Sequence, residues 1–193
     1  MGEIKTRTMT AKQGEQILIR TAADDDAADV LNLFRSVIAE GRYTLLTLDE
    51  FKRTEEAERL AITNDRKRPG NLHIVAVVEG QIVGMARVRS GELKQTAHFG
   101  NVDSVWVYSD WRRQGIGNAI IETIVQWAEE NEGIEKLGLF VFSTSKGAIA
   151  LYQRNGFIIE GRAPRDMKFG EDDYADTVIM GRMVDGSSSF DVS

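Results

Sequence analysis

The middle of the chain constrains the fold most, because a predicted strand there joins a predicted helix through a short turn rich in glycine and arginine. Val105 and Val107 alternate with Trp106 in a β-branched and aromatic run, which predicts a strand. Beyond the turn, apolar residues take up helical spacing at positions 116, 120, 121, 124, 125 and 128. The fold must therefore accommodate a strand–turn–helix unit near the centre of the sequence.

The turn has the properties of an anion-binding site. The first turn of a helix has four backbone N–H groups without partners inside the helix, and the helix dipole favours negative charge there. Gly115 and Gly117 have no Cβ, so a phosphate can approach the backbone closely. Arg112 and Arg113 add positive charge to the same turn. We interpret residues 112–117 as a cradle for a pyrophosphate.

Two common nucleotide-binding patterns fit this turn less well. The dinucleotide-binding fingerprint needs three glycines in a first strand–helix unit and an acidic residue about 20 positions later. Here the third glycine position falls on Asn118 or Ala119, and the turn lies in mid-chain after a predicted antiparallel hairpin. The phosphate-binding loop of many nucleoside triphosphatases requires Gly-Lys followed by Ser or Thr, which this turn lacks.

Composition narrows the class of protein. A length of 193 residues, with 42% apolar and 28% charged residues, is typical of one soluble globular domain. No apolar run approaches the roughly 18 residues needed to span a bilayer, and the N-terminus lacks the apolar core of a secretory signal. We therefore expect a cytoplasmic protein that does not bind membranes. The net charge of −6 argues against non-specific binding of nucleic acid, which depends on basic surface.

The absence of cysteine limits the chemistry. The chain contains none, so neither a disulfide framework nor a thiolate metal site can form, and we expect no metal site. A covalent acyl intermediate on a cysteine is excluded for the same reason. Direct attack, in a complex that holds donor and acceptor together, is then the natural mechanism for an acyl transfer.

Residues 17–184 are expected to form a single domain. Residues 1–16 are polar without periodicity, and residues 185–193 are rich in serine, so both are expected to be flexible. Helices are predicted over residues 27–39, from a cap at Thr47 or Asp49 to about residue 63, from 116 to about 131, and from a cap at Ser143 or Ser145 to Gly156. Strands are predicted over residues 17–20, 72–79, 81–89, 97–107, 136–142, 157–160 and 176–184. This order predicts a mixed α/β sheet.

A second motif follows the predicted strand over residues 136–142. It fits the pattern Asn-x-x-Ala-x-x-Leu-Tyr-x-x-x-Gly-Phe at Ala148, Leu151, Tyr152, Gly156 and Phe157, with Ser145 at the asparagine position. Together with the Gln/Arg-x-x-Gly-x-Gly/Ala pattern of residues 112–117, it resembles the GNAT superfamily of acetyl-coenzyme A-dependent N-acetyltransferases. The resemblance covers roughly residues 17–184. Within that superfamily, residues 161–176 look like the loop and final hairpin of bacterial small-amine, amino-acid and ribosomal-protein acetyltransferases.

The resemblance implies an α/β (α+β) GNAT fold. It has a mixed, mostly antiparallel central sheet of about six to seven strands, flanked by about four helices. Its central strands are splayed around the coenzyme. The family often forms dimers, so the resemblance also makes a homodimer an expectation.

The resemblance assigns the coenzyme to named positions. Backbone amides of residues 113–118 would hold the pyrophosphate, and backbone groups of Val105 and Val107 would pair with the pantetheine arm as with an added strand. Ser145 would replace the usual asparagine contact with a shorter side chain. The implied coenzyme-binding residues are Val105, Val107, Arg112, Arg113, Gln114, Gly115, Ile116, Gly117, Asn118, Ser145 and Tyr152. Acetyl-coenzyme A is the implied co-substrate.

The family's chemistry carries over to three functions. Tyr152 would be the general acid that protonates the leaving thiolate, and the Val107 backbone N–H would stabilise the developing oxyanion. The base is open. Strand alternation predicts that Asn101, Asp103, Val105 and Val107 share one side, with His98 on the other unless a bulge intervenes.

The family's strand-borne glutamate falls at Asn101, which cannot act as a base. We favour Asp103, acting directly or through water, and His98 and a chain of waters are the alternatives.

The acceptor site is the least patterned part of the sequence. In the family, the segment between the first two helices lines it, which makes Glu40, Arg42 and Tyr43 candidates here. The function implied is transfer of an acetyl group to the primary amine of a small molecule, such as a polyamine, an amino acid or an amine antibiotic. A protein N-terminal or lysine acetyltransferase is the alternative within the class. A non-catalytic module that binds coenzyme A as a sensor or scaffold is the alternative of another class.

Overall fold

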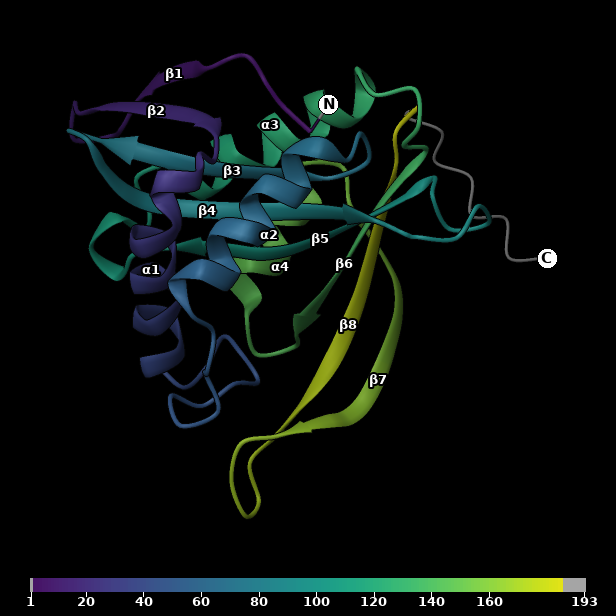
Figure 1. The fold of residues 1–193 in the computed structure, drawn as a ribbon. Coiled ribbons are helices and arrows are strands. Elements are labelled where there is room, and N and C mark those ends of the chain that lie inside the picture. Colours follow the sequence, from purple (N-terminus) through teal and green to yellow (C-terminus); the bar gives the residue numbers. More distant parts are fainter. Residues whose placement is uncertain (1, 186–193) are drawn as a thin grey trace.

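A computed structural model describes residues 2–185 of the chain, and within them eight strands form one sheet in the order β1-β2-β3-β4-β5-β6-β8-β7 (Figure 1). The sheet is one strand larger than expected, because β1 comes from the N-terminal segment. The strands are β1 (Arg7–Thr10), β2 (Gln16–Thr21), β3 (Leu72–Val78), β4 (Gln81–Ser90), β5 (Phe99–Val107), β6 (Lys136–Phe142), β7 (Ile158–Lys168) and β8 (Tyr174–Met183). The α-helices are α1 (Ala27–Ala39), α2 (Glu55–Lys67), α3 (Ile116–Glu129) and α4 (Lys146–Arg154).

The sheet divides where β5 meets β6. Every other pairing is antiparallel, but these two strands run parallel and pair only from Phe99–Lys136 to Asn101–Gly138. Beyond that point β6 continues on β8, whereas β5 continues on β4 alone. The two central strands therefore diverge toward their C-terminal ends, as Figure 1 shows. The predicted splay is confirmed.

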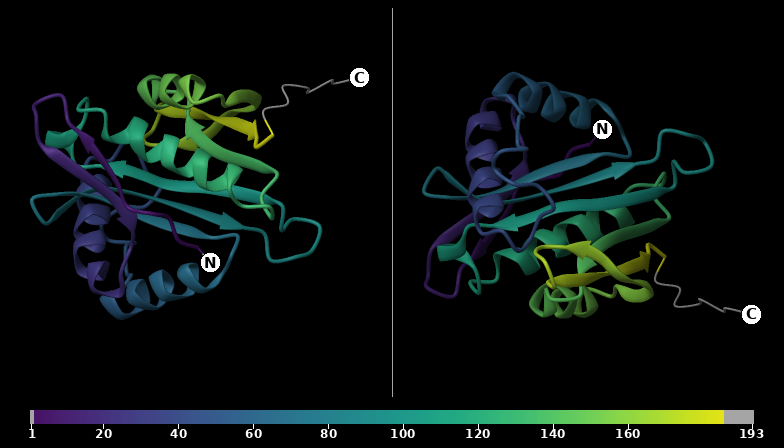
Figure 2. Two further views of the ribbon diagram at one scale, coloured as in Figure 1. Left: turned by 90° about the horizontal axis from the view of Figure 1, so that it is seen from above. Right: turned by 90° about the horizontal axis from the view of Figure 1, so that it is seen from below.

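Helices cover both faces of the sheet (Figure 2). Helices α3 and α4 pack on one face over a large apolar cluster that includes Ile120, Ile124 and Phe157. Helices α1 and α2 pack on the other face over a smaller cluster that includes Phe34, Ile62 and Met85. Figure 2 also shows α1 and α2 on the opposite side of the sheet from the β7–β8 end of the molecule. Both faces of β3 are thus buried along its whole length.

The N-terminal segment differs from the sequence expectation. Residues 7–10 pair with β2 as an antiparallel edge strand, Ala11 is buried, and the Gly2 amide donates to the Arg66 carbonyl at 3.1 Å. A polar edge strand is held by backbone hydrogen bonds and needs no apolar alternation, so the pattern gave no sign of it. The serine-rich tail predicted for residues 185–193 lies outside the described residues from position 186 onward.

Helix α2 begins later than predicted. Thr47 and Glu50 form a local turn instead of a cap, because the Glu50 carboxylate accepts from both the amide and the hydroxyl of Thr47 at 2.9 Å. The helix begins after Thr54, whose hydroxyl accepts from the Ala57 amide at 3.2 Å. Residues 41–54 consequently form a long connection, here named the α1–α2 loop. The helix over residues 27–39 and the strand over residues 136–142 are confirmed at their predicted bounds.

Candidate active site

A bulge in β5 determines which side chains face which side of the sheet. Met85 pairs with Trp106 and Arg87 with Asp103, so two residues of β5 lie opposite Ala86 alone. Ser104 has a left-handed φ of 53°, which marks the extra residue. Simple alternation across residues 101–107 is therefore wrong.

The bulge separates the residues that alternation had placed together. Val105 and Val107 pack against the cluster under α3 and α4, whereas Trp106 packs against the cluster under α1 and α2. Asp103 pairs with Arg87 and Asn101 with Arg89, on the same side as Met85 and Trp106. The β5 side chains beside the cradle and those facing α1 and α2 thus lie on opposite sides of the sheet.

The predicted pyrophosphate cradle, residues 112–117, presents mainly backbone groups. Arg113 and Gly115 both adopt left-handed conformations, with φ of 65° and 97°. Such turns aim successive N–H groups to one side, and the non-glycine residue among them is strained. Helix α3 starts after Gly115 as its N-cap. Among the described residues, none accepts a hydrogen bond from the amides of residues 113–115, so these donors are available to an anion.

Helix α4 packs against the start of α3 and completes this region. A Cβ at Gly117 would lie 3.4 Å from Leu151, which is ordinary van der Waals contact. The Asn155 side chain donates to Asn118 Oδ1 at 3.0 Å and to the Leu151 carbonyl at 2.9 Å. Gly156 has a left-handed φ of 81° at the end of α4, as predicted. The two motifs that are separated in sequence are therefore adjacent in space.

Tyr152 lies on the inner side of α4. The residue is 7% exposed, and its ring centroid is 5.9 Å from that of Phe157. Burial raises the pKa of the Tyr152 phenol above its ordinary value of 10.0, because the anion would be poorly solvated there. The hydroxyl therefore keeps its proton at neutral pH. Ser145 is the N-cap residue of α4, and its side chain makes no capping hydrogen bond.

Arg112 does not point at the cradle. Its Nε donates to the Val107 carbonyl at 3.0 Å, and its Nη1 donates to Glu40 Oε2 at 2.6 Å. Its Nη2 donates to the other carboxylate oxygen of Glu40. Its guanidinium carbon lies 5.0 Å from the centre of the Tyr43 ring. The structure thus connects one predicted phosphate ligand with two predicted acceptor-site residues.

The candidate bases are placed differently. Asp103 Oδ2 accepts two hydrogen bonds from Arg89, at 3.0 and 2.6 Å, and the aspartate side chain is 23% exposed. His98 lies in a turn before β5, at the end of the strand opposite Val107, and its side chain is exposed. Nine residues of extended strand separate the two ends, roughly 25 to 30 Å. This position argues against His98 as the base, whereas Asp103 remains a prediction.

A buried ionic cluster under α2 leaves no motif in the sequence. Asp65 accepts from Arg87 at 3.0 and 2.6 Å and from Asn71 at 2.9 Å, all in the protein interior. Glu58 is fully buried, and Arg53 Nε lies 2.6 Å from its Oε2 without the geometry of a hydrogen bond. Burial raises the pKa of the Glu58 carboxyl, and the nearby Arg53 guanidinium opposes that shift. The sequence shows only a strongly charged helix here, because the partners of its buried acids come from elsewhere: Arg87 of β4 for Asp65, and Arg53 of the α1–α2 loop for Glu58.

His73 belongs to the same cluster. It is 0% exposed, and both ring nitrogens lack hydrogen-bond partners among the described residues. Burial lowers the His73 pKa well below 6.5, and the positive charges of Arg87, Arg53 and Arg89 lower it further. The imidazole is therefore neutral.

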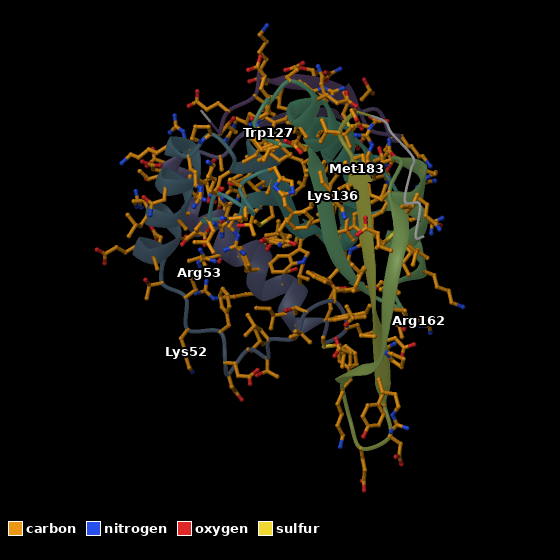
Figure 3. All side chains as sticks on the ribbon, turned by 90° about the vertical axis from the view of Figure 1, so that its right-hand side faces the viewer. Lys52, Arg53, Trp127, Lys136, Arg162 and Met183 are labelled. Carbon is orange, nitrogen blue, oxygen red and sulfur yellow. The ribbon has the colours of Figure 1, made fainter. Side chains whose placement is uncertain are left out.

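The α1–α2 loop brings aromatic and basic residues to the sheet. Phe34 of α1 stacks on Phe51 with ring centroids 5.7 Å apart and meets Trp106 edge-on at 4.3 Å. The Arg53 guanidinium lies over Phe34 at 5.7 Å. Figure 3 shows Arg53 on the loop and Arg162 on β7, on opposite sides of the lower half of the molecule in that view.

Two hollows border α3. One, of about 190 Å³, lies between β1 and α3 and touches Gly115 and Asn118. A larger open groove of about 830 Å³ runs along α3, the end of α4 and Arg182. Neither Val107 nor Tyr152 lines them, so these hollows flank the cradle instead of marking the place of acetyl transfer. Residues 2–185 contain no cluster of acidic or histidine side chains suited to a metal, and no helix among them could cross a bilayer.

The comparisons with known proteins agree with this geometry. The model of the Acetyltransferase (GNAT) family matches residues 40–157. The L-amino acid N-acetyltransferase AaaT of Escherichia coli is 28% identical over 127 residues, covering 65% of this chain and 74% of that protein. An N-alpha-acetyltransferase of Sulfurisphaera tokodaii is 29% identical over 154 residues, covering 76% and 83%.

A solved structure shows the same fold. The acetyltransferase of the GNAT family from Streptococcus pneumoniae superposes with a TM-score of 0.82 at 26% identity, covering 86% of this chain and 99% of that one. The chain belongs to the GNAT acetyltransferase family. It is an acyltransferase, and the family expectation drawn from residues 112–117 and 145–157 is confirmed.

Proposed function

We propose that this chain transfers the acetyl group of acetyl-coenzyme A to the primary amine of a small molecule. The observation that carries the proposal is the divergence of β5 from β6 beside the unpartnered amides of residues 113–115. The divergence exposes a strand edge with free backbone groups, and the amides supply an anion site at one end of it. An extended thioester with a pyrophosphate requires that combination.

Binding of the coenzyme depends mainly on backbone. The amides of residues 113–118 would hold the pyrophosphate at the positive end of α3. The pantetheine arm would lie along β5 at Val105 and Val107, where β6 no longer pairs. Bound acetyl-coenzyme A supplies an activated acetyl thioester. The chain's task is then to orient that carbonyl and to manage two protons.

The chemistry needs two donors and one acceptor. As the C–N bond forms and the C–S bond breaks, the Val107 N–H would stabilise negative charge on the carbonyl oxygen. Tyr152 would stabilise the departing thiolate by donating its hydrogen bond or its proton. Because burial keeps the Tyr152 hydroxyl protonated, this donor is present across the neutral pH range. No cysteine is present to carry the acetyl group, and the amine would attack the thioester directly.

The amine must lose a proton to become a nucleophile. We propose Asp103 as the acceptor of that proton, directly or through water. It lies on the side of β5 that faces α1 and α2, beside Trp106. Both Arg89 hydrogen bonds go to Oδ2. Asn101 is on the same side and cannot take this role.

The acceptor is proposed to bind between the α1–α2 loop and β5. The half-buried Arg53 beside Phe34 would suit an acceptor whose amine stands near a carboxylate. The similarity to an L-amino acid N-acetyltransferase supports an amino acid over a polyamine. The similarity to an N-alpha-acetyltransferase favours a second candidate, the amino terminus of a protein or peptide. Both share an α-amine.

Thiol release with a panel of amines tests the proposal. The panel contains amino acids, their amides, a polyamine and peptides with free amino termini, with acetyl-coenzyme A as donor. We expect release with amino acids and little with the polyamine. Release with peptides alone would select the N-terminal acetyltransferase. Tight coenzyme binding without release from any amine would overturn the proposal in favour of a coenzyme A sensor.

A further inference from the structure

The end of β5 is held by a side chain from the cradle turn. The peptide unit between Val107 and Tyr108 is fixed at both of its polar atoms. Its carbonyl accepts from Arg112 Nε at 3.0 Å, and its N–H donates to the Val83 carbonyl at 3.0 Å. The bond to Val83 belongs to the strand pairing, whereas the bond to the Val107 carbonyl comes from Arg112 alone. Arg112 therefore contributes directly to the position of Val107.

The same arginine reaches the other half of the molecule. Both of its terminal nitrogens donate to the two carboxylate oxygens of Glu40, which is the C-cap residue of α1. The pair is about 30% exposed on each side, so it is partly shielded from water. A two-pronged contact of this kind fixes orientation as well as distance. Tyr43, three residues further on, lies against the guanidinium at 5.0 Å.

We infer that Arg112 and Glu40 form a clamp that positions the α1–α2 loop against the end of β5. Arg112 is a positioning residue in this account, with no direct contact to the coenzyme phosphates. Three of the five N–H groups of its guanidinium, one on each nitrogen, already donate to Val107 and Glu40. These bonds direct the group toward the end of α1, so the pyrophosphate is left to the backbone amides of the cradle. The inference rests on the proposed function for its kinetic consequence, since acceptor binding and acetyl transfer meet at this clamp.

Two substitutions separate the clamp from a phosphate contact. Arg112→Lys keeps the positive charge but cannot bond Val107 and both Glu40 oxygens together. Glu40→Gln weakens the same clamp but leaves the positive charge of Arg112 in place. A contact between Arg112 and a phosphate would therefore survive this substitution. We expect each to lower kcat/KM for the amine about tenfold, which corresponds to about 1.4 kcal/mol, while the coenzyme Kd stays within about twofold.

A double variant and a remote control complete the kinetic test. The Arg112→Lys, Glu40→Gln double variant should be no worse than the poorer single variant, because both changes break one unit. Arg59→Gln removes an exposed pair with Glu55 on α2, whose nitrogen and oxygen are 2.6 Å apart, and should leave all constants unchanged. A rise in coenzyme Kd for the Arg112 variant, with Glu40→Gln silent, would overturn the clamp and make Arg112 a phosphate ligand.

Limited cleavage by trypsin tests the clamp without any acetyl transfer. Arg42 is exposed in the α1–α2 loop, one residue beyond Gly41 and between Glu40 and Tyr43. We expect faster cleavage after Arg42 in Glu40→Gln and Arg112→Lys than in wild type, with thermal midpoints close to that of wild type. Equal cleavage rates would contradict the clamp. If no amine is acetylated by wild type, the proposed function fails, and the cleavage comparison still decides the clamp.

Discussion

The two halves of the site are built from different materials. On the α3 and α4 side, the proposed coenzyme cradle consists of backbone amides, two glycines and a splayed strand edge. On the α1 and α2 side, the proposed acceptor region consists of a long loop, aromatic contacts and ion pairs between distant residues. A backbone site needs particular residues at fixed spacing, and a side-chain site needs only partners that meet in space. The first half therefore leaves a motif in the sequence, and the second does not.

The ionic cluster under α2 illustrates the difference. Asp65 and Arg87 are 22 positions apart, and both are nearly inaccessible. Breaking such a pair would leave a buried charge without compensation, which is strongly destabilising. The cluster thus holds α2 against the sheet. Helix α2 directly follows the α1–α2 loop, so the cluster also anchors the end of that loop. On the cradle side, the buried polar residues within 2–185 are Thr123 and Thr177, and single buried atoms of Gln114 and Arg182 lack hydrogen-bond partners there. The buried Asp65–Arg87 pair has no counterpart among them.

The largest effect is expected from a substitution that disrupts the cradle alone. Gly117→Asp places a carboxylate where the pyrophosphate would bind, so the coenzyme Kd should rise more than about 100-fold, or about 2.7 kcal/mol, in calorimetry. An acidic residue in the first helical turn does not weaken the helix, so the thermal midpoint should not fall. Gly117→Ala is the matched control, because its Cβ would only touch Leu151 at 3.4 Å. Unchanged affinity in the aspartate variant would refute the cradle.

The next effect also falls on the cradle side, at Tyr152 of α4. Tyr152→Phe should lower kcat about 100-fold through loss of the donor to the thiolate, with the coenzyme Kd unchanged. Single-turnover thiol release measures this directly. Tyr174→Phe removes a hydroxyl from β8 near Arg165 and should leave turnover unchanged. If Tyr152→Phe retains the wild-type rate, the residue is only a core aromatic.

A smaller effect is confined to the acceptor half. Asp103→Asn should lower kcat/KM for the amine about tenfold at neutral pH. This is less than the roughly 10²- to 10⁴-fold typical of general base catalysis, because water can still take up part of the proton transfer. The loss should shrink as pH rises, because more of the amine is already neutral. Arg89→Gln removes the partner of Asp103 and should raise kcat/KM for the amine at neutral pH, because the carboxylate is then free to accept a proton. Identical pH–rate profiles for wild type and Asp103→Asn would point to a water chain as the base.

The last effect is on stability and arises beneath the acceptor half. The folded protein keeps His73 neutral, whereas the unfolded chain protonates it below its ordinary pKa of 6.5. The unfolded state then binds more protons, so His73 makes stability fall with decreasing pH below about 6.5, by up to about 1.4 kcal/mol per pH unit. Above that pH, His73 does not change how the free energy of unfolding depends on pH. The raised pKa of Glu58 acts in the opposite direction above 4.5.

Urea denaturation between pH 5 and 7.5 measures this slope. His73→Gln cannot titrate, so the difference between wild type and variant should shrink or reverse as pH falls. A constant difference across the range would contradict the buried, neutral histidine.

The predictable part of the fold follows the strength of its local patterns. Helix α1 and strand β6 were predictable to the residue because apolar spacing and flanking turns coincide there. Gly41 and Gly156 were predictable as helix ends, and both have left-handed φ. Strand β1 was not, because its short, mostly polar sequence shows no alternation, and it is held by pairing with β2 and by contacts of Arg7 and Met9 with distant residues. The start of α2 was misplaced because two threonines compete as caps, and Thr47 instead bonds to Glu50.

The bulge in β5 shows the limit for the site. Nothing in the side chains of residues 101–107 announces an extra residue at Ser104, and one residue is enough to turn Asp103 away from Val107. The partner of Arg112 was equally hidden, because Glu40 lies 72 positions earlier. The roles of Tyr152, Val107 and Asp103 stay predictions, and so do a homodimer and a cytoplasmic location.

The central claim is that the two halves join to move an acetyl group from coenzyme to amine. Mass spectrometry after incubation with isotopically labelled acetyl-coenzyme A and an amino acid tests it most directly. We predict the label on the α-amine of the amino acid, free coenzyme A in equal amount, and no label on the protein. Bound coenzyme with the label on neither amino acid nor peptide would contradict the claim.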